Sequence, residues 1–371
     1  MAEIRPNLLV VLCDQLRRDA LGAFGDPNIA TPHLNCLAGE GVLFTGACCT
    51  LIADSPAADR RYGPDNHRGM EVDMHAVFGS RPLEYPCADL GELRISNPHA
   101  DIDSLARVLH EDGYLLLRGL LSREHVLAGR EAVLSYMAAK EALTPGTPLL
   151  EGVMPRVGKR VQLMNNQDVV TLPAVSGVLE HPHLFRFFEQ LFRNDVATFA
   201  YKWLRAVGNE QYTGAHMDFV YMGRGSDRLH TVWIPFGDIE VEQGTLCVCE
   251  GSNHLDSFAH LRQTYGRSDV DRDRTEGWFT KEPMDITEQF GGRWLTADFL
   301  AGDVILFGMH TMHASTTNLT NRYRLSCDVR YQPAGDPMDE RWRRNGIGHS
   351  GYQGEDGPLR TMDELRKEWG L

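Results

Sequence analysis

Four His-x-Asp triplets stand out as residues whose types and spacing allow metal chemistry: His99-x-Asp101, His110-x-Asp112, His216-x-Asp218 and His254-x-Asp256. In an extended strand, residues two apart point to the same side, so the imidazole and the carboxylate can bind one ion. In a helix the same residues lie about 200° apart and cannot. Oxygen-activating Fe(II) enzymes hold the metal with two histidines and one carboxylate, which leaves the opposite face open.

The sequence around each triplet favours one of them. His110 lies at the end of a predicted helix, His99 in a polar loop, and His254 after a turn that ends a strand. His216-x-Asp218 lies between a predicted strand and the apolar run at 219–222, which is typical of the mouth of a sheet. We therefore expect His216 and Asp218 to be metal ligands.

The second histidine must come from a later strand, and residues 302–315 offer His310 and His313. His313 is favoured because Ser315 follows on the same face and Arg324 comes eleven residues later. A guanidinium in that place can bind the far end of a dicarboxylate through a bidentate pair. Burying these polar groups without partners would cost several kcal/mol, a cost that a metal and a dicarboxylate relieve. His310 is expected to be a neighbour or a packed core histidine.

The elements that must position these residues change in type along the chain. Apolar periodicity predicts helices over 103–110, 122–138 and 179–192, and a strand over 113–119. Short runs rich in Val, Ile, Trp and Tyr then predict strands at 197–206, 231–235, 245–250, 303–307 and 323–331. Helices followed by a run of strands indicate an α+β fold with a β-sandwich or barrel at its centre.

Composition divides the rest of the chain. Residues 51–98 are rich in Pro, Asp, Arg and Gly and are expected to form a linker or surface wrap, between a segment 1–50 and a main domain over 99–335. Residues 336–371 are polar and are expected to form a C-terminal tail packed on the surface. The stretch 255–296 is a long insertion between strands, and such insertions often form lids.

Residues 103–333 resemble the phytanoyl-CoA dioxygenase family of Fe(II)/2-oxoglutarate oxygenases. The resemblance is carried by the segments HEDGYLLLRGLLSREHV, HPHLFRFFEQLF, HMD, TVWIPFGDIEVEQGTLCVCEGSNH and GDVILFGMHTMHASTTNLTNRYRLSCDVRYQP. It implies an α+β fold whose core is a double-stranded β-helix, the cupin-like jelly roll, with flanking helices. It also implies a dioxygenase that hydroxylates a small molecule with O₂ while 2-oxoglutarate is decarboxylated to succinate and CO₂.

The resemblance also assigns residues. The family's metal ligands correspond to His216, Asp218 and His313. The two residues that bind the C5 carboxylate of 2-oxoglutarate in the family correspond to Ser315 and Arg324. Trp233 lies eleven residues before Gly244, the spacing of a tryptophan that contacts the cosubstrate in some members, and core packing explains it equally well. Because Asp218 is present, the halide-binding variant of the family, which lacks the carboxylate, is not expected.

The identity of the substrate cannot be read from these residues. Arg224, Arg228 and His230 follow the metal motif, where they are either contacts for an anionic substrate or exposed loop charges. A catalytically inactive jelly-roll binding protein is one alternative to the oxygenase.

A second alternative is a sulfatase or alkaline-phosphatase-like hydrolase, because residues 5–47 resemble the start of a sulfatase. That chemistry is disfavoured, since the family's metal-binding Asp-Asp pair is replaced by Cys13-Asp14. The Cys-x-Pro-x-Arg motif is also absent, because residues 48–52 read Cys-Cys-Thr-Leu-Ile. Residues 1–50 are therefore expected to be a non-catalytic sulfatase-like fragment.

Composition excludes other classes of function. The chain has 371 residues and a formal net charge of −14, which argues against binding to nucleic acid or to an anionic membrane surface. No apolar run approaches the ~20 residues that a membrane helix needs. The eight cysteines form no CxxC pair, and Cys247 and Cys249 lie in an apolar strand, as expected of reduced, buried thiols. We expect a cytoplasmic protein, and the sequence does not indicate its oligomeric state.

Overall fold

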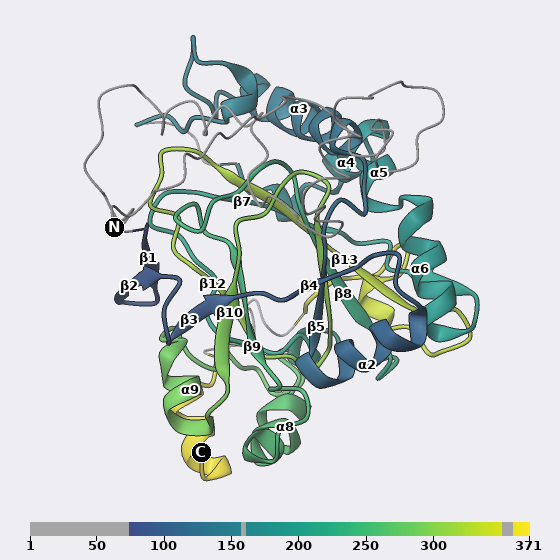
Figure 1. The fold of residues 1–371 in the computed structure, drawn as a ribbon, viewed down its shortest axis with the longest axis vertical. Helices are drawn as coiled ribbons and strands as arrows, with labels where there is room; N and C mark the ends of the chain where they lie inside the picture. The colour runs from purple at the N-terminus through teal and green to yellow at the C-terminus, as the bar shows by residue number, and fades with distance from the viewer. Residues whose placement is uncertain (1–73, 157–160, 351–358) are drawn as a thin grey trace, which may run out of the picture. The chain divides into compact units, whose positions relative to one another are not determined.

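Strands from both halves of the chain build two β-sheets that face each other (Figure 1). The computed structural model describes residues 74–156, 161–350 and 359–371. The predicted sulfatase-like fragment 1–50 lies outside the described residues, as do residues 51–73 of the predicted linker.

Both sheets combine strands that are far apart in the chain. The smaller sheet has the order β12 (His313–Ser315), β9 (Leu246–Glu250), β10 (Arg293–Thr296) and β3 (Leu90–Glu92). The larger sheet has the order β4 (Ile95–Ser96), β5 (Tyr114–Leu117), β11 (Val304–Gly308), β8 (His230–Pro235), β13 (Arg324–Pro333) and β6 (Val196–Thr198). β7 (Trp203–Val207) pairs with β13 as well, and β1 (Met74–Phe78) and β2 (Arg81–Tyr85) form a hairpin.

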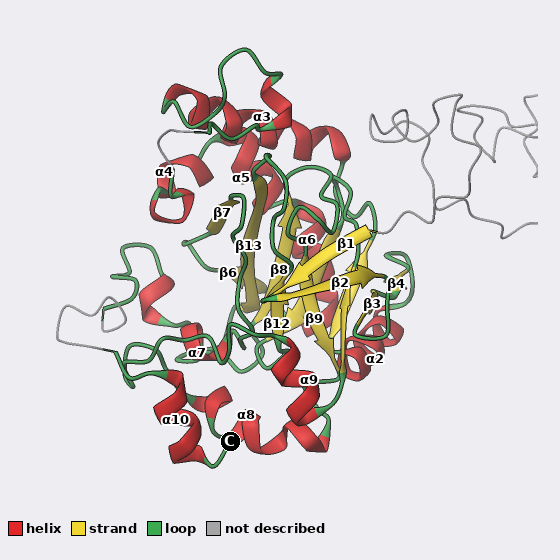
Figure 2. Ribbon diagram, turned by 90° about the vertical axis from the view of Figure 1, so that its left-hand side faces the viewer, coloured by secondary structure: helices red, strands yellow, loops and turns green. Residues whose placement is uncertain are grey.

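The helices lie outside this pair of sheets (Figure 2). They are α2 (Ile102–Asp112), α3 (Arg123–Ala139), α4 (Gln167–Val170), α5 (Pro173–Leu179), α6 (Pro182–Phe192), α7 (Phe219–Met222), α8 (Ala259–Gln263), α9 (Met284–Phe290) and α10 (Met362–Trp369). None of the described helices is both long enough and apolar enough to cross a bilayer.

Strand alternation divides the apolar side chains into separate cores. On β13, Leu325, Cys327, Val329 and Tyr331 pack with the helices α3, α5 and α6 on the outer face of the larger sheet. Between the sheets, Trp233, Ile305 and Phe307 of the larger sheet meet Leu246, Val248 and Leu295 of the smaller one. Two facing, mainly antiparallel sheets with helices around them form the predicted α+β jelly roll, so the fold class is confirmed.

Helix caps explain why two predicted helices are correct and one is divided. Asp101 caps α2 by accepting a hydrogen bond from the Ser104 N–H, and Gly113 ends it with a positive φ of 84°. Ser122 caps α3 in the same way as Asp101 caps α2. The predicted helix 179–192 is divided because Pro182 starts α6 afresh.

The predicted strand 197–206 is also divided, into β6 and β7. The intervening residues turn away from β13 because they are hydrogen-bonded elsewhere: the Ala200 N–H donates to Trp342 O, and the Lys202 N–H donates to the side chain of Gln167.

Residues 74–96 do not form the linker that composition predicts. They make four short strands, and β3 joins β10 in the smaller sheet while β4 joins β5 in the larger one. Their exposed positions carry the polar residues that suggest a linker, whereas Ala76, Phe78 and Leu90 are fully buried. The linker prediction is therefore wrong for this part of the chain.

The C-terminal residues are more deeply packed than a surface tail. Trp342 is buried, and α10 buries Met362 and Leu365 in the core beside β1, α8 and α9. A capping box between Thr361 and Glu364 starts α10. The polar composition of residues 336–371 therefore conceals a few apolar residues that anchor the segment.

Truncation tests whether residues 74–96 are strands of the folded domain or a linker before it. Residues 72–371 form one compact unit by their internal contacts, and we expect a chain that starts at Val72 to fold and to bind metal. A chain that starts at Pro98 loses β3, β4 and the buried Leu90, so it should be insoluble or unfold at a clearly lower temperature. Circular dichroism during heating measures the difference. Equal melting of both chains would restore the linker interpretation.

Candidate metal centre

Three predicted ligands converge between the sheets. One ligand atom from each of His216, Asp218 and His313 lies within 4.8 Å of the other two, and all three side chains are buried. His313 opens β12, while His216 forms an isolated antiparallel bridge with it. The two backbone hydrogen bonds of that bridge measure 2.9 and 3.0 Å, and they bring the imidazole centroids to 4.1 Å.

The backbone around Asp218 differs from the expected strand. Asp218 has helical φ and ψ of −63° and −23° and is the N-cap residue of α7. The apolar run 219–222 that follows the motif forms one helical turn. The backbone is extended at the His216 bridge and turns helical at Asp218. This turn directs the Asp218 carboxylate toward His313, and Asp218 Oδ1 lies 3.8 Å from His313 Nε2.

Hydrogen bonds orient both imidazoles for metal binding. His216 Nδ1 lies 2.8 Å from Gly214 O, and His313 Nδ1 lies 3.0 Å from Thr311 O. Because a carbonyl oxygen only accepts, Nδ1 carries the proton in each ring and Nε2 presents its lone pair to the site. Burial, followed by the neighbouring His313, lowers the pKa of His216 to about 3, and burial also lowers the pKa of His313.

Asp218 is held in its ionised form by partners that the sequence analysis missed. Arg330 Nη2 donates to both carboxylate oxygens at 3.1 and 3.2 Å, and the hydroxyl of Thr231 donates to Oδ2. Burial alone would raise the pKa of Asp218, but Arg330 and the other partners hold it well below its usual range. Arg330 lies against the Trp203 ring, 4.2 Å from its centroid. The signal was in the alternation of polar residues along 324–332, which places Arg330 on the face of Arg324.

Arg324 and Trp233 lie together on the inner face of the larger sheet. The Arg324 guanidinium lies 5.7 Å from the centroid of the Trp233 ring. Its Nη1 donates to Ser326 Oγ, and its buried Nε has no hydrogen-bond partner. A buried guanidinium with an unused donor is what a carboxylate ligand requires.

Ser315 is buried on the same face of β12 as His313, as expected. Its Oγ accepts a hydrogen bond from the Thr213 N–H at 2.8 Å, which fixes the hydroxyl and leaves its proton to donate. The hydrogen bond that Arg324 makes to a serine goes to Ser326 rather than to Ser315.

The other His-x-Asp triplets do not gather ligands within the described residues. Asp101 caps α2, and Asp112 pairs with Arg94 at 2.6 Å. His310 stacks on Phe219 with ring centroids 4.9 Å apart, which agrees with a packed neighbour of the site rather than a ligand.

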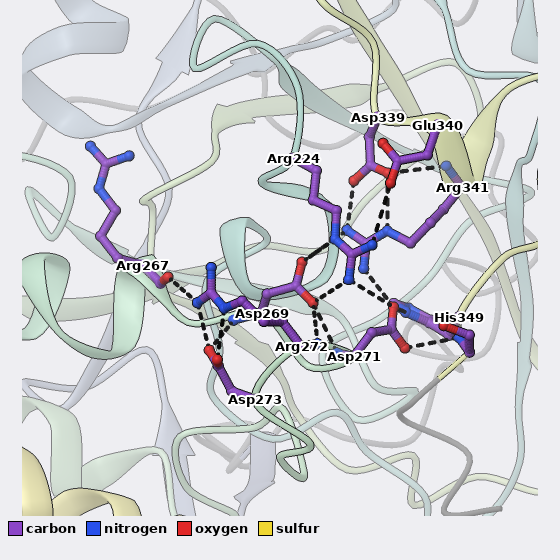
Figure 3. Close-up of polar contacts among 11 residues, drawn as sticks. Arg224, Arg267, Asp269, Asp271, Arg272, Asp273, Asp339, Glu340, Arg341 and His349 are labelled. Atoms are coloured by element: carbon purple, nitrogen blue, oxygen red, sulfur yellow. Dashed lines mark hydrogen bonds and ion pairs between the residues drawn. The ribbon is translucent and has the colours of Figure 1, made fainter. Parts of the chain in front are cut away.

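Arg224 and Arg228 are committed to carboxylates. Arg224 binds Asp269 through two hydrogen bonds of 2.6 and 2.9 Å, and Arg228 binds Asp336. Figure 3 shows that Arg224 belongs to a larger network, which joins the end of α7 to the insertion and to the C-terminal residues. We call it the α7 network, and it comprises Arg224, Asp269, Asp271, Asp339, Glu340, Arg341 and His349.

With this geometry established, comparison with known proteins decides the family. The family model described as phytanoyl-CoA dioxygenase matches residues 109–326, more than half of the chain. The chain belongs to the phytanoyl-CoA dioxygenase family. It is therefore an iron- and 2-oxoglutarate-dependent oxygenase, as the resemblance implied, and the donors of the candidate metal site and the unused Nε donor of Arg324 suit both cofactors.

Curated relatives match two parts of the chain. The 1-deoxypentalenic acid 11-beta-hydroxylases of Streptomyces arenae and Streptomyces exfoliatus are each 27% identical, over 63% of this chain and 82% of theirs. An ulvan-active sulfatase of Formosa agariphila is 56% identical over 52 residues, which are 14% of this chain. The chain spans only a tenth of that sulfatase's length, so the match is confined to a fragment.

Two solved structures are among those to which the chain is similar. The epimerase SnoN from nogalamycin biosynthesis has 19% identity and a TM-score of 0.44, over 70% of this chain and 95% of its own. EctD from S. alaskensis, solved with 2-oxoglutarate and 5-hydroxyectoine, has 17% identity and a TM-score of 0.47, over 73% of this chain and 90% of its own.

Replacing one ligand tests the assignment of the metal site. His313→Ala should weaken Fe(II) binding by about 100-fold or more, because a three-residue site loses one of its donors. His310→Ala removes a histidine three residues away and should bind Fe(II) as the wild type does. Anaerobic calorimetry measures both, and equal losses in the two variants would contradict the assignment.

Arg330 should act on the metal through Asp218. Arg330→Met keeps much of the side-chain volume but removes the donor to the carboxylate, so Fe(II) affinity should fall by roughly 10- to 100-fold. Arg330→Lys, which retains the charge, should recover part of the loss. Unchanged affinity in the Met variant would show that Arg330 only fills space.

Proposed function

We propose that His216, Asp218 and His313 hold Fe(II) on one face, and that Arg324 binds the C5 carboxylate of 2-oxoglutarate. The convergence of three buried ligand atoms within 4.8 Å carries this proposal. When bound, iron and 2-oxoglutarate supply the oxidation of a C–H bond by O₂, with release of succinate and CO₂. The product is a hydroxylated small molecule, and the names of the Streptomyces relatives support hydroxylation as the outcome.

The chain's own residues prepare the site in three ways. The carbonyl oxygens of Gly214 and Thr311 hold the ring proton of each histidine on Nδ1, and burial lowers the pKa of both rings, which favours the neutral form that binds a metal. Thr231 and Arg330 fix the angle of the Asp218 carboxylate. The apolar side chains between the sheets exclude water on the side of Phe307, whose ring lies 4.6 Å from that of His313.

Arg324 supplies the charge that selects a dicarboxylate. Its position beside Trp233 in a buried site strengthens a bidentate pair, because water does not compete there. Ser315 is the second proposed contact for this carboxylate, through its hydroxyl proton. Trp233 forms one wall of the cosubstrate site in this proposal.

A cytoplasmic location is also proposed. The described cysteines Cys87, Cys247, Cys249 and Cys327 are all free thiols, which suits a reducing compartment. The proposed arrangement of the chain is a sulfatase-like fragment that takes no part in catalysis, followed by the oxygenase domain.

Turnover of 2-oxoglutarate in the absence of substrate tests the function. The Fe(II)-loaded protein should form succinate slowly, and Arg324→Gln should raise the KM for 2-oxoglutarate by about 100-fold, since a charged hydrogen bond is lost. Arg322→Gln is the matched control, because Arg322 lies two residues away, is partly exposed and pairs only loosely with Glu240 at 4.0 Å.

Two outcomes would contradict the proposal. Metal binding without any succinate, alone or with a library of small molecules, would favour the inactive binding protein. Equal KM values for the variants at 324 and 322 would remove Arg324 from the cosubstrate site. Unchanged Fe(II) affinity in Arg324→Gln shows that the variant is folded.

A further inference from the structure

The inner face of the larger sheet carries an unusual density of charge beside the proposed metal site. Register pairs place Arg205 of β7 opposite Ser326 of β13, and Asp328 lies opposite Trp233 of β8. Arg324, Ser326, Asp328 and Arg330 alternate with the residues of β13 that pack against the helices, so they all face inward. We call Arg205, Arg324, Asp328 and Arg330 the inner charged row.

Asp328 is shared by two of these guanidiniums. Arg205 Nε donates to Asp328 Oδ2 at 3.0 Å, and Arg330 Nη1 lies 3.7 Å from the same oxygen. Arg330 also contacts Asp218, so the inner charged row runs without interruption from Arg205 to the ligand of the proposed metal site. Arg205 is close to the cosubstrate end as well, because Ser326, its register partner on β13, accepts a hydrogen bond from Arg324.

The charges do not balance when the proposed cofactors are present. Asp218 and the C1 carboxylate of 2-oxoglutarate neutralise a ferrous ion, and the C5 carboxylate neutralises Arg324. Within the part of the chain that the structure describes, Asp328 then remains as the counter-charge that Arg205 and Arg330 share. One positive charge is left over in a site of low dielectric constant, where an unpaired charge is costly.

That charge is accessible only at Arg205. The Arg330 side chain is 2% exposed, whereas 28% of the Arg205 side chain remains exposed although it faces the space between the sheets. Within the described residues, Nε is the only side-chain nitrogen of Arg205 that donates a hydrogen bond. Its two Nη groups therefore offer a pair of donors to a molecule in the site.

We propose that Arg205 binds a carboxylate of the substrate, so that the enzyme's substrates are monoanionic carboxylic acids. The proposal rests on the proposed function and names the substrate class of that site. The planar pair of Nη donors matches a carboxylate in bidentate geometry. A phosphate monoester brings up to two negative charges, and only one positive charge awaits compensation.

We propose Arg205 as the contact for an anionic substrate instead of Arg224, Arg228 and His230, the candidates from the sequence. Arg224 and Arg228 already hold carboxylates of Asp269 and Asp336, so neither has its charge free for a substrate. The ring centroid of His230 lies 6.1 Å from that of Phe188 and 5.5 Å from that of Phe192, both on α6, which covers the outer face of the sheet.

Binding measurements test the proposal without turnover. The protein with Fe(II) and 2-oxoglutarate under anaerobic conditions is titrated calorimetrically with benzoate, cyclohexanecarboxylate, 1-adamantanecarboxylate and decanoate, and with the primary amide of each. At least one acid should bind about 10-fold or more tightly than its amide, since the amide lacks the charge. Arg205→Gln should abolish that preference, and Arg205→Lys should retain part of it.

Controls separate this proposal from the proposed function. Arg193→Gln changes an arginine that is 74% exposed and should keep the preference for acids. Arg205→Gln should bind 2-oxoglutarate as the wild type does; a wild type that fails to bind 2-oxoglutarate would refute the proposed function instead. The substrate proposal is overturned if no acid binds, if amides bind as tightly as acids, if Arg205→Gln keeps the preference, or if that variant loses 2-oxoglutarate affinity.

Discussion

The antiparallel bridge between His216 and His313 is the contact on which the site depends. Two backbone hydrogen bonds join segments that are far apart in the chain, and they need no particular side chain to form. Once they form, the two imidazoles must lie side by side, and the helical turn that begins at Asp218 brings the carboxylate to them. Main-chain pairing therefore sets the positions of the two imidazoles in the proposed metal site, while hydrogen bonds from Nδ1 to carbonyl oxygens set the ring orientation.

Sequence patterns could predict which three side chains converge, because these residues break the rule for apolar strands. His216, Asp218 and His313 are polar groups in apolar surroundings, and the spacing from His313 to Arg324 narrowed the choice between His310 and His313. The helical turn at 219–222 could not be predicted, because an apolar run of four residues fits a strand or a turn of helix equally well. Likewise, residues 74–96 look like a linker by composition, and only long-range pairing with β10 and β5 turns them into strands.

Charges on the inner face were the main feature that sequence reasoning left unused. Arginines are usually exposed, so the sequence alone offered no reason to predict Arg205 and Arg330 as residues of the site. The alternation in Arg-Leu-Ser-Cys-Asp-Val-Arg, residues 324–330, does place its polar members on one face, but which face is inner follows only from the packing of helices on the other. The sheet thus divides one strand into an apolar side that packs against the helices and a charged side that faces the proposed metal site.

The separation of Asp218 from Arg330, 112 residues along the chain, has a consequence for biosynthesis. On the ribosome, the first two ligands emerge long before the arginine that orients one of them, and before the third ligand itself. Arg341 of the α7 network emerges later still, although Asp271 and Asp339 enclose it completely. The complete metal site that we propose can therefore form only after most of the polypeptide has been translated.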